Sequence, residues 1–164
     1  MTERFLKPDA EKIAEALKFI RGFSSVVLGS VTQSGQPHTS YAPHITDAGN
    51  FYIYVSTLAQ HAETLSNGGA SLFFIESERQ AKSIFARKRL TIYCRVSSIN
   101  RENQHYDRLL DALQARHGSM LKLLRRLADF NLIQLTPKQA SFVTGFGAAY
   151  DMSGALSELT KTAG

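Results

Sequence analysis

Seven short segments of the chain combine apolar, aromatic and β-branched residues in the way typical of β-strands, and along one of them, 87–96, apolar and polar residues alternate. Turn residues such as glycine, proline and asparagine separate several of these segments, which is typical of antiparallel hairpins. The sequence therefore predicts a mainly antiparallel β-structure. The predicted strands cover residues 24–33, 37–45, 51–56, 70–76, 87–96, 130–135 and 140–150.

Three other segments repeat their apolar residues at helical spacing. The first begins at Pro8 and ends at Gly22, the second is a short helix over 57–66, and the third covers 102–127 with a break near Gly118. Hairpins accompanied by a few helices predict one α+β domain built as a β-barrel. Its expected parts are an N-terminal helix (1–22), the barrel with inserted helices (23–150) and a C-terminal tail (151–164).

The predicted strand over 87–96 has two unlike faces, because successive side chains of a strand point to opposite sides. One face is apolar and predicts a core contact; it carries Leu90, Ile92, Cys94 and Val96. The opposite face is polar but partly aromatic; it carries Arg89, Thr91, Tyr93 and Arg95. Such a face suits a ligand groove or a subunit interface better than bare solvent.

The composition is that of a globular protein, with 43% hydrophobic and 20% charged residues among 164. No apolar run approaches the roughly 18 residues of a membrane span, and the first residues lack the apolar stretch of a secretory signal. The single cysteine, Cys94, excludes an internal disulfide and suits a reducing cytoplasm. We therefore expect a cytoplasmic protein without a membrane partner.

The formal net charge is +5, and the basic residues are scattered and mixed with acids. No nucleic-acid-binding motif is present, so the charge favours an anionic small molecule over nucleic acid as partner. The five histidines show no zinc-like spacing, and no nucleophile elbow, P-loop or dinucleotide fingerprint occurs. Gly145-Phe146-Gly147 lies inside a predicted strand, which indicates close backbone packing there.

Two stretches could bind an anion. Ser56 and Thr57 stand at the predicted start of the short helix, where they either cap the helix or help its first amides to bind an anion; Gln60 and His61 would add donors. The run Arg87-Lys88-Arg89 is either a solvated sheet edge or a site for phosphate or carboxylate. The residues alone leave both pairs of alternatives open.

Several segments, in this order, resemble the HugZ/HutZ family of bacterial haem-utilisation proteins: TSYAPHI, YVSTLAQHAETL, AKSIFARKRLTIY, LADFNLIQLTP and ASFVTGFGAAYDMSG. That family lies within the pyridoxamine 5′-phosphate oxidase-like superfamily of FMN-binding split barrels. The resemblance covers the chain from about Gly22 onward. It implies an antiparallel split β-barrel with peripheral helices, and a homodimer with two sites at the subunit interface.

The resemblance also implies particular site residues. Arg89 matches a family arginine associated with haem, and Asp129 matches the acid that hydrogen-bonds the iron-ligating histidine, so these two are the expected catalytic residues. The cofactor is expected to be haem, or alternatively FMN. Its expected binding residues are Ser40, Tyr41, Ser56, Thr57, His61, Arg87, Lys88 and Arg89.

One family feature is missing. The family's iron-ligating histidine follows the GFGxAY strand, whereas no histidine here follows His117. Either the natural chain continues past Gly164 to this ligand or this member lacks it, so the metal ligand stays unassigned. The leading expectation is a haem-degrading protein that uses an electron donor and releases iron. The alternatives are an FMN-dependent oxidoreductase and a protein that stores or delivers haem without cleaving it.

Overall fold

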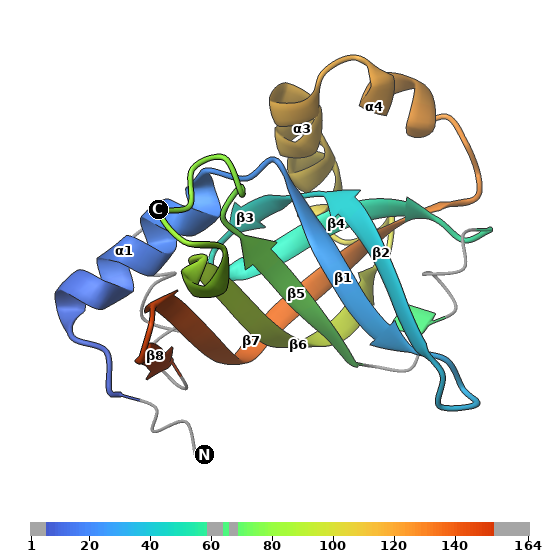
Figure 1. Ribbon diagram of the computed structural model, residues 1–164. Coiled ribbons are helices and arrows are strands. Elements are labelled where there is room, and N and C mark those ends of the chain that lie inside the picture. Colours follow the sequence, from blue (N-terminus) through green and yellow to red (C-terminus); the bar gives the residue numbers. More distant parts are fainter. Residues whose placement is uncertain (1–5, 59–63, 66–68, 153–164) are drawn as a thin grey trace.

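The computed structural model of the chain describes residues 6–58, 64–65 and 69–152. Most of the secondary structure is one antiparallel sheet with helices around it (Figure 1). The helices are α1 (Ala10–Arg21), the 3-10 turn η1 (Ile84–Ala86), α3 (Tyr106–His117) and α4 (Met120–Leu124). The strands are β1 (Ser25–Val31), β2 (Pro37–Pro43), β3 (Ile45–Asp47), β4 (Asn50–Ser56), β5 (Gly69–Ile75), β6 (Arg89–Ile99), β7 (Phe130–Gly145) and β8 (Ala148–Asp151).

The sheet has the strand order β2-β1-β5-β6-β7-β4-β3, and β8 pairs with β7. β2 and β3 stand at the two ends of this order, yet only His44 separates them in the chain. The sheet must therefore curl until its two edges meet, although no hydrogen-bonded ladder joins them among the described residues. The result is an unclosed barrel, which confirms the predicted α+β split-barrel class.

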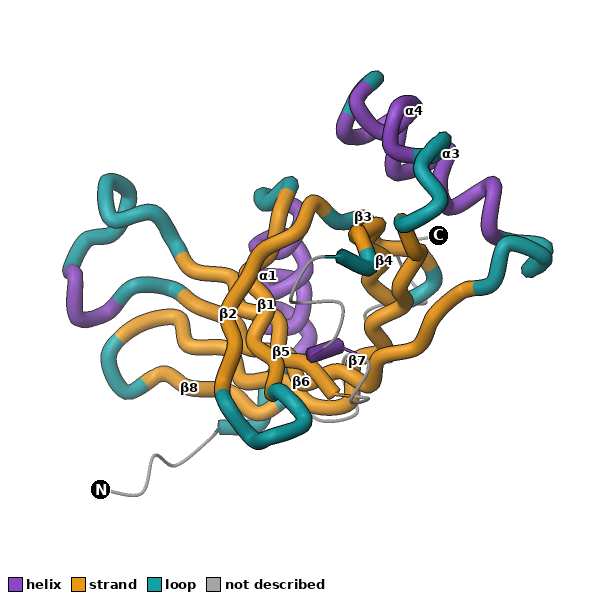
Figure 2. The backbone as a smooth tube through the Cα atoms, turned by 90° about the vertical axis from the view of Figure 1, so that its right-hand side faces the viewer, coloured by secondary structure: helices purple, strands orange, loops and turns teal. Residues whose placement is uncertain are grey.

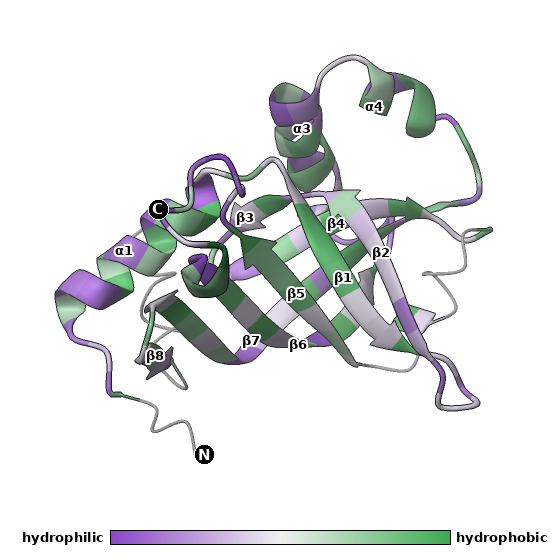
Figure 3. Cartoon of the chain, viewed as in Figure 1, coloured by the Kyte–Doolittle hydropathy of each residue, from purple (hydrophilic) through white to green (hydrophobic). Residues whose placement is uncertain are grey.

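The inner face of the curled sheet holds the main core. Along β6 the predicted alternation is confirmed, because Leu90, Ile92 and Cys94 are buried while Tyr93 is exposed. Hydrophobic and hydrophilic bands follow one another along β6 and β7 in Figure 3. Burial raises the pKa of the Cys94 thiol to about 12, so it behaves as a small apolar side chain.

α1 begins and ends as its sequence predicts. The Asp9 side chain accepts a hydrogen bond from the Lys12 backbone N–H at 2.7 Å, and the helix stops at Gly22. Its apolar side places Ala16 and Ile20 in the main core. Figure 1 shows α1 at one end of the barrel, away from α3 and α4.

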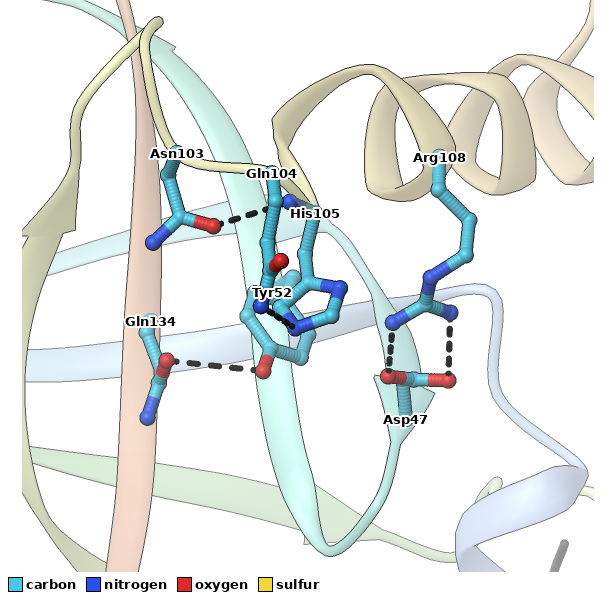
Figure 4. Close-up of polar contacts among 7 residues, drawn as sticks. All are labelled: Asp47, Tyr52, Asn103, Gln104, His105, Arg108 and Gln134. Carbon is cyan, nitrogen blue, oxygen red and sulfur yellow. Dashed lines mark hydrogen bonds and ion pairs between the residues drawn. The ribbon is translucent and has the colours of Figure 1, made fainter.

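α3 and α4 pack against the outside of β3, β4 and β7 and form a second core. Gly118, with φ of 88°, separates the two helices, which confirms the predicted break. Arg108 of α3 holds Asp47 of β3 with two hydrogen bonds of 3.0 and 2.8 Å (Figure 4). This contact lowers the pKa of the Asp47 carboxyl.

The predicted first and last residues were wrong for two parts of the sheet. The segments 130–135 and 140–150 were predicted as separate strands, but residues 130–145 form one strand, β7. It passes Pro137 by means of a bulge at Lys138, where the ladder to β6 shifts by one residue and the missing proline N–H is tolerated. The predicted strand 37–45 is interrupted at His44. The predicted helix 57–66 and tail 151–164 lie largely outside the described residues.

Gly145 is the last residue of β7, and Phe146-Gly147 form the turn to β8, so the three residues are not strand interior. Gly147 adopts φ of 69°, a conformation that favours glycine, and Phe146 is 83% exposed. Close packing inside a strand was therefore the wrong reason for these glycines. They allow the chain to reverse.

His44, at the corner between β2 and β3, is the most confined titratable side chain of the barrel. Its ring is 1% exposed and packs against Phe51 and Phe74, with ring centroids 5.7 and 5.6 Å away. Its Nδ1 is buried without a hydrogen-bond partner, while its backbone carbonyl accepts a hydrogen bond from Nε2 of His117 at 2.8 Å. Burial, helped by Arg116 and His117, lowers the pKa of His44 to about 4.

The depressed pKa of His44 predicts acid sensitivity. The unfolded chain takes up a proton near pH 6.5, whereas the folded chain resists it until about pH 4. Stability should therefore fall as the pH is lowered between these values, by about 3 kcal/mol from this residue. In His44→Phe, which keeps an aromatic ring, urea unfolding at pH 7 and pH 4.5 should show a smaller difference than in the native protein. An identical difference in both proteins would contradict this assignment.

Candidate functional site

Three predicted site residues meet where β4 ends and β7 begins. Ser56, the last residue of β4, pairs with Phe130, the first residue of β7. The Ser56 hydroxyl donates a hydrogen bond of 2.6 Å to a carboxylate oxygen of Asp129, and the Thr57 N–H donates one of 2.6 Å to the Asp129 carbonyl. The same Ser56 oxygen accepts a hydrogen bond from the Leu58 N–H. The carboxylate of Asp129 is thereby held in one orientation.

The three cations of the basic run have different roles. Arg87 precedes β6 and turns back to β5, where its guanidinium donates hydrogen bonds to the Glu76 carbonyl and reaches the Glu78 carboxylate at 3.4 Å. Lys88 reaches across to α1, where its ammonium lies 2.6 Å from the Glu15 carboxylate. Both charges are committed within the chain.

Glu15 lies between two lysines, because Lys12 on its own helix also contacts it at 2.6 Å. Burial alone would raise the pKa of Glu15, but the hydrogen bonds from Lys12 and Lys88 outweigh it and lower the pKa. Lys88 therefore serves to fasten α1 to the start of β6. Its availability to a ligand is reduced accordingly.

Arg89 is the member of the run that keeps its charge uncommitted. Its guanidinium makes one long hydrogen bond, of 3.4 Å, to the Arg87 carbonyl, and it contacts no carboxylate in the described part of the chain. It begins β6 on the outer face, half-buried between Ile75 and Val143 of the neighbouring strands. A half-buried guanidinium without a carboxylate is suited to bind an external anion.

Ser40 and Tyr41 point to opposite faces of β2, so they cannot serve the same face of one site. The Ser40 hydroxyl oxygen is buried and has no hydrogen-bond partner, whereas Tyr41 is 69% exposed on the outer face. His61, the remaining predicted binding residue, lies outside the described residues. The roles predicted for these three residues stay predictions.

Arg89 and Asp129 lie at opposite ends of the same ladder. Arg89 pairs with Val143 near one end of β7, whereas Asp129 precedes the other end of β7. The 11 residues of β6 alone cover roughly 35 Å at about 3.3 Å per residue. Figure 2 shows the β7–β8 turn at one end of the molecule and α3 and α4 at the other. One subunit therefore does not bring these two residues to one ligand.

The outer face of the sheet between these ends has two adjacent rows without charge, bordered on β6 by Arg89 on one side and the exposed Arg95 on the other. One row across β2, β1, β5 and β6 consists of Tyr41, Val27, Phe73 and Thr91, and the next consists of Thr39, Gly29, Ser71 and Tyr93. Tyr93 is 53% exposed, and neither row contains a charged residue. Strand alternation predicted Tyr93 on this face, but Val27 and Phe73 became candidates only once the register aligned the strands.

Neither a metal centre nor a membrane span is found in the described part. No three histidine, cysteine, aspartate or glutamate side chains gather around a common point within 6–58, 64–65 and 69–152. No helix in these ranges is long and apolar enough to cross a membrane.

Comparisons with known proteins agree on one family. A sequence model described as pyridoxamine 5′-phosphate oxidase matches residues 13–144. The curated protein heme oxygenase HutZ of Vibrio cholerae is 34% identical over 150 residues, which are 91% of this chain and 82% of that protein.

Two solved structures extend this agreement to the fold. A crystal structure of HutZ from Vibrio cholerae, described as a heme storage protein, has a TM-score of 0.74 at 34% identity and covers 82% of this chain and 95% of that one. Campylobacter jejuni ChuZ has a TM-score of 0.81 at 28% identity and covers 94% of this chain and 63% of that one.

The Ser56–Asp129 contact can be tested by removing its donor. Ser56→Ala should lower the free energy of unfolding by about 1–2 kcal/mol, because a charge-assisted hydrogen bond between two strand ends is lost. Urea unfolding monitored by circular dichroism measures the change. Ser97→Ala is the matched control, since Ser97 is exposed on β6 and its side chain makes no hydrogen bond to another described residue. Equal losses in both variants would show that the contact contributes nothing.

Proposed function

The chain belongs to the pyridoxamine 5′-phosphate oxidase family, in the branch that contains HutZ, and we propose that it binds haem between two subunits and degrades it to release iron. Haem is here the substrate. Dioxygen is the oxidant, and a separate electron donor supplies the reducing equivalents. When bound, the iron porphyrin supplies the oxygen chemistry, and the protein positions it.

The single observation that carries this proposal is the uncommitted charge of Arg89. Arg87 and Lys88 are occupied by Glu76, Glu78 and Glu15, so one guanidinium of the run is left for an external anion. Haem offers two propionates on an otherwise apolar ring, and a guanidinium binds a carboxylate through two parallel hydrogen bonds. Ile75 and Val143 beside Arg89 offer apolar contact for the ring edge.

A homodimer is part of the same proposal. Arg89 and Asp129 stand too far apart in one subunit to meet a single haem, but two copies packed in opposite directions through the outer sheet face would bring Arg89 toward Asp129 of the partner subunit. The uncharged rows around Val27 and Tyr93 suit such a contact, because interface cores are depleted of charge and enriched in aromatic residues. The ligand site is then incomplete without the second copy.

Asp129 would act through a second group. Ser56 donates a hydrogen bond to one oxygen of the Asp129 carboxylate. The carboxylate can accept a further hydrogen bond, and it could thereby orient a histidine that ligates iron. No histidine follows His117 up to Gly164, so these residues identify no histidine for Asp129 to orient. We propose Asp129 as a positioning residue, and the iron ligand stays unassigned.

Two other functions have specific support. The family match favours FMN, and the uncommitted guanidinium of Arg89 would suit its phosphate. The HutZ structure is described as that of a storage protein, which favours haem binding without cleavage. The lone, buried Cys94 suits a reducing cytoplasm in all three cases.

Hemin titration tests the role of Arg89. The purified protein should shift the Soret band of hemin and saturate at one haem per subunit, and Arg89→Gln should bind about tenfold to a hundredfold more weakly, because a charge-assisted contact is lost. Arg21→Gln, an exposed arginine of α1, removes the same charge and should leave the affinity unchanged. Equal affinities in all three proteins would exclude Arg89 from the site.

The fate of the Soret band separates the three functions. With ascorbate and oxygen, degradation should abolish the band and release iron that a ferrous chelator detects. A stable band under the same conditions would establish storage or delivery instead. A yellow protein that releases flavin on heating and leaves the hemin spectrum unchanged would establish the FMN alternative.

The dimer can be broken at its proposed centre. Tyr93→Glu places a charge on the outer sheet face and should convert a dimer into monomers in sedimentation equilibrium, with unchanged circular dichroism and weakened hemin binding. Leu123→Glu is the control, since this exposed leucine lies on α4. A native protein that sediments as a monomer at micromolar concentration would refute the shared site.

A further inference from the structure

The two uncharged rows on the outer face of the sheet have opposite patterns of side-chain size. They cross β2, β1, β5 and β6, which lie side by side in Figure 1. On each of these strands, one row has the larger side chain and the other row has the smaller one. In the order of the strands, the first row consists of Tyr41, Val27, Phe73 and Thr91, and the second consists of Thr39, Gly29, Ser71 and Tyr93.

The surface of the two rows is lowest at Gly29. A Cβ atom added at Gly29 would collide with the Oγ atom of Ser71, so a larger residue there would require that hydroxyl to move. The neighbouring outward residue of the same strand, Val27, is 38% exposed. A hollow and a projection thus lie about 7 Å apart, which is the spacing of outward-facing residues along one strand.

The alternation of large and small residues makes this face complementary to itself. A two-fold axis that runs along the rows, midway between them, would lay the first row of one copy on the second row of the other. Val27 would then face the partner's Gly29, and Phe73 would face the partner's Ser71. Packed sheets are about 10 Å apart, a gap that one large and one small side chain fill. Two large side chains would clash there, and two small ones would leave a void.

Two arginines stand at equal distances on either side of the two rows. Arg89 is two residues before Thr91 on β6, and Arg95 is two residues after Tyr93. Arg95 is exposed, and its side chain makes no ion pair or hydrogen bond to another described residue. The same axis would therefore place Arg89 opposite the partner's Arg95, where two like charges repel each other unless an anion lies between them.

The curvature of the sheet leaves room for such an anion. The outer face of a curled sheet is convex, so two copies would touch most closely at the middle of the shared face. That middle lies at β1 and β5, between β2 and β6. The space between two such barrels widens toward β6, where Arg89 and Arg95 lie. A ligand can therefore enter beside the arginines without separating the two sheets.

The occupant that this pattern favours is a second copy of the chain. A face that complements itself under a two-fold axis is the property of an isologous dimer interface, and an unrelated partner would not require it. The four strands and the four rows from Arg89 to Arg95 cover roughly 19 by 27 Å, the size of the centre of a standard interface of about 800 Å² per partner.

We propose that two copies pack through this face about a two-fold axis midway between the two rows, and that an anion is held between Arg89 and the partner's Arg95. Each strand then crosses its own counterpart in the opposite direction. The dimer contains two such anion sites, related by the axis. This inference rests on the dimer that is part of the proposed function, and it adds the register of the two copies and Arg95 as a further ligand-binding residue.

Exchanging a large and a small residue tests the register. In Thr91→Tyr two tyrosines would face each other across the contact, so the dimer should dissociate at least about tenfold more readily in sedimentation equilibrium. Tyr93→Thr leaves a void and should weaken the dimer as well. The variant with both Thr91→Tyr and Tyr93→Thr again opposes one large to one small residue, and should recover the native dissociation constant within about threefold. Circular dichroism checks that every variant is folded.

Inorganic phosphate tests the anion site without haem. Millimolar phosphate should tighten the haem-free dimer about tenfold relative to sodium chloride of the same ionic strength, because it neutralises both arginines. Arg95→Gln should abolish this response and should weaken hemin binding about tenfold or more, as Arg89→Gln does. Arg79→Gln, which removes an exposed arginine before η1, should leave both the phosphate response and the hemin affinity unchanged.

Three results would overturn the inference. They are a native protein that sediments as a monomer at micromolar concentration, a double variant that dissociates as readily as Thr91→Tyr, and a phosphate response that Arg95→Gln leaves unchanged. Haem binding is judged separately. A dimer that the double exchange restores, in a protein that leaves the hemin spectrum unchanged, would contradict haem binding and support this inference. A dimer that binds hemin but is not restored by the exchange would do the opposite.

Discussion

The short connection between β2 and β3 is the constraint on which the rest of the fold depends. In a flat sheet with this strand order, the two edge strands would stand about 29 Å apart, since neighbouring strands are about 4.8 Å apart. A single residue, His44, spans at most about 7 Å between its neighbours. The sheet is therefore forced into a barrel, and the corner residue is enclosed by the rings it brings together, Phe51 and Phe74.

Curling also decides how the charges are divided. It brings α1 over the start of β6, so that Glu15 can neutralise Lys88, and it leaves Glu76 beside Arg87. Three consecutive cations thereby become two internal contacts and one uncommitted guanidinium. An anionic ligand would therefore meet the single charge of Arg89, and not the three charges that the sequence of the run indicates. On the outer face, the two rows that contain Val27 and Tyr93 stay uncharged between Arg89 and Arg95.

Much of the barrel could be predicted from the sequence, because apolar and polar residues alternate along β6, and because β1, β4 and β5 are rich in β-branched and aromatic residues. The limits of β7 could not, because Pro137 and the glycines at 145 and 147 normally mark strand ends, and only the pairing to β6 and β4 shows the bulge that carries the strand past Pro137. The corner at His44 was likewise invisible, since its neighbours read as continuous strand. A local sequence pattern does not show which strand will pair with which.

For the candidate site, Arg89, Ser56 and Asp129 were each named before the structure, but their arrangement was not. The resemblance to a family supplied Asp129, and only the structure joined it to Ser56. Spacing along the chain does not show which side chains from distant segments meet in space.

The unbroken length of β7 has a consequence for how this protein can change. Because one strand of 16 residues connects the Asp129 end to the Gly145 end, the backbone itself sets the interval between them. Side-chain replacements can retune what each end recognises, but they cannot shift one end relative to the other. Related proteins with this strand can therefore differ in the residues at its two ends, while the distance between the ends stays the same.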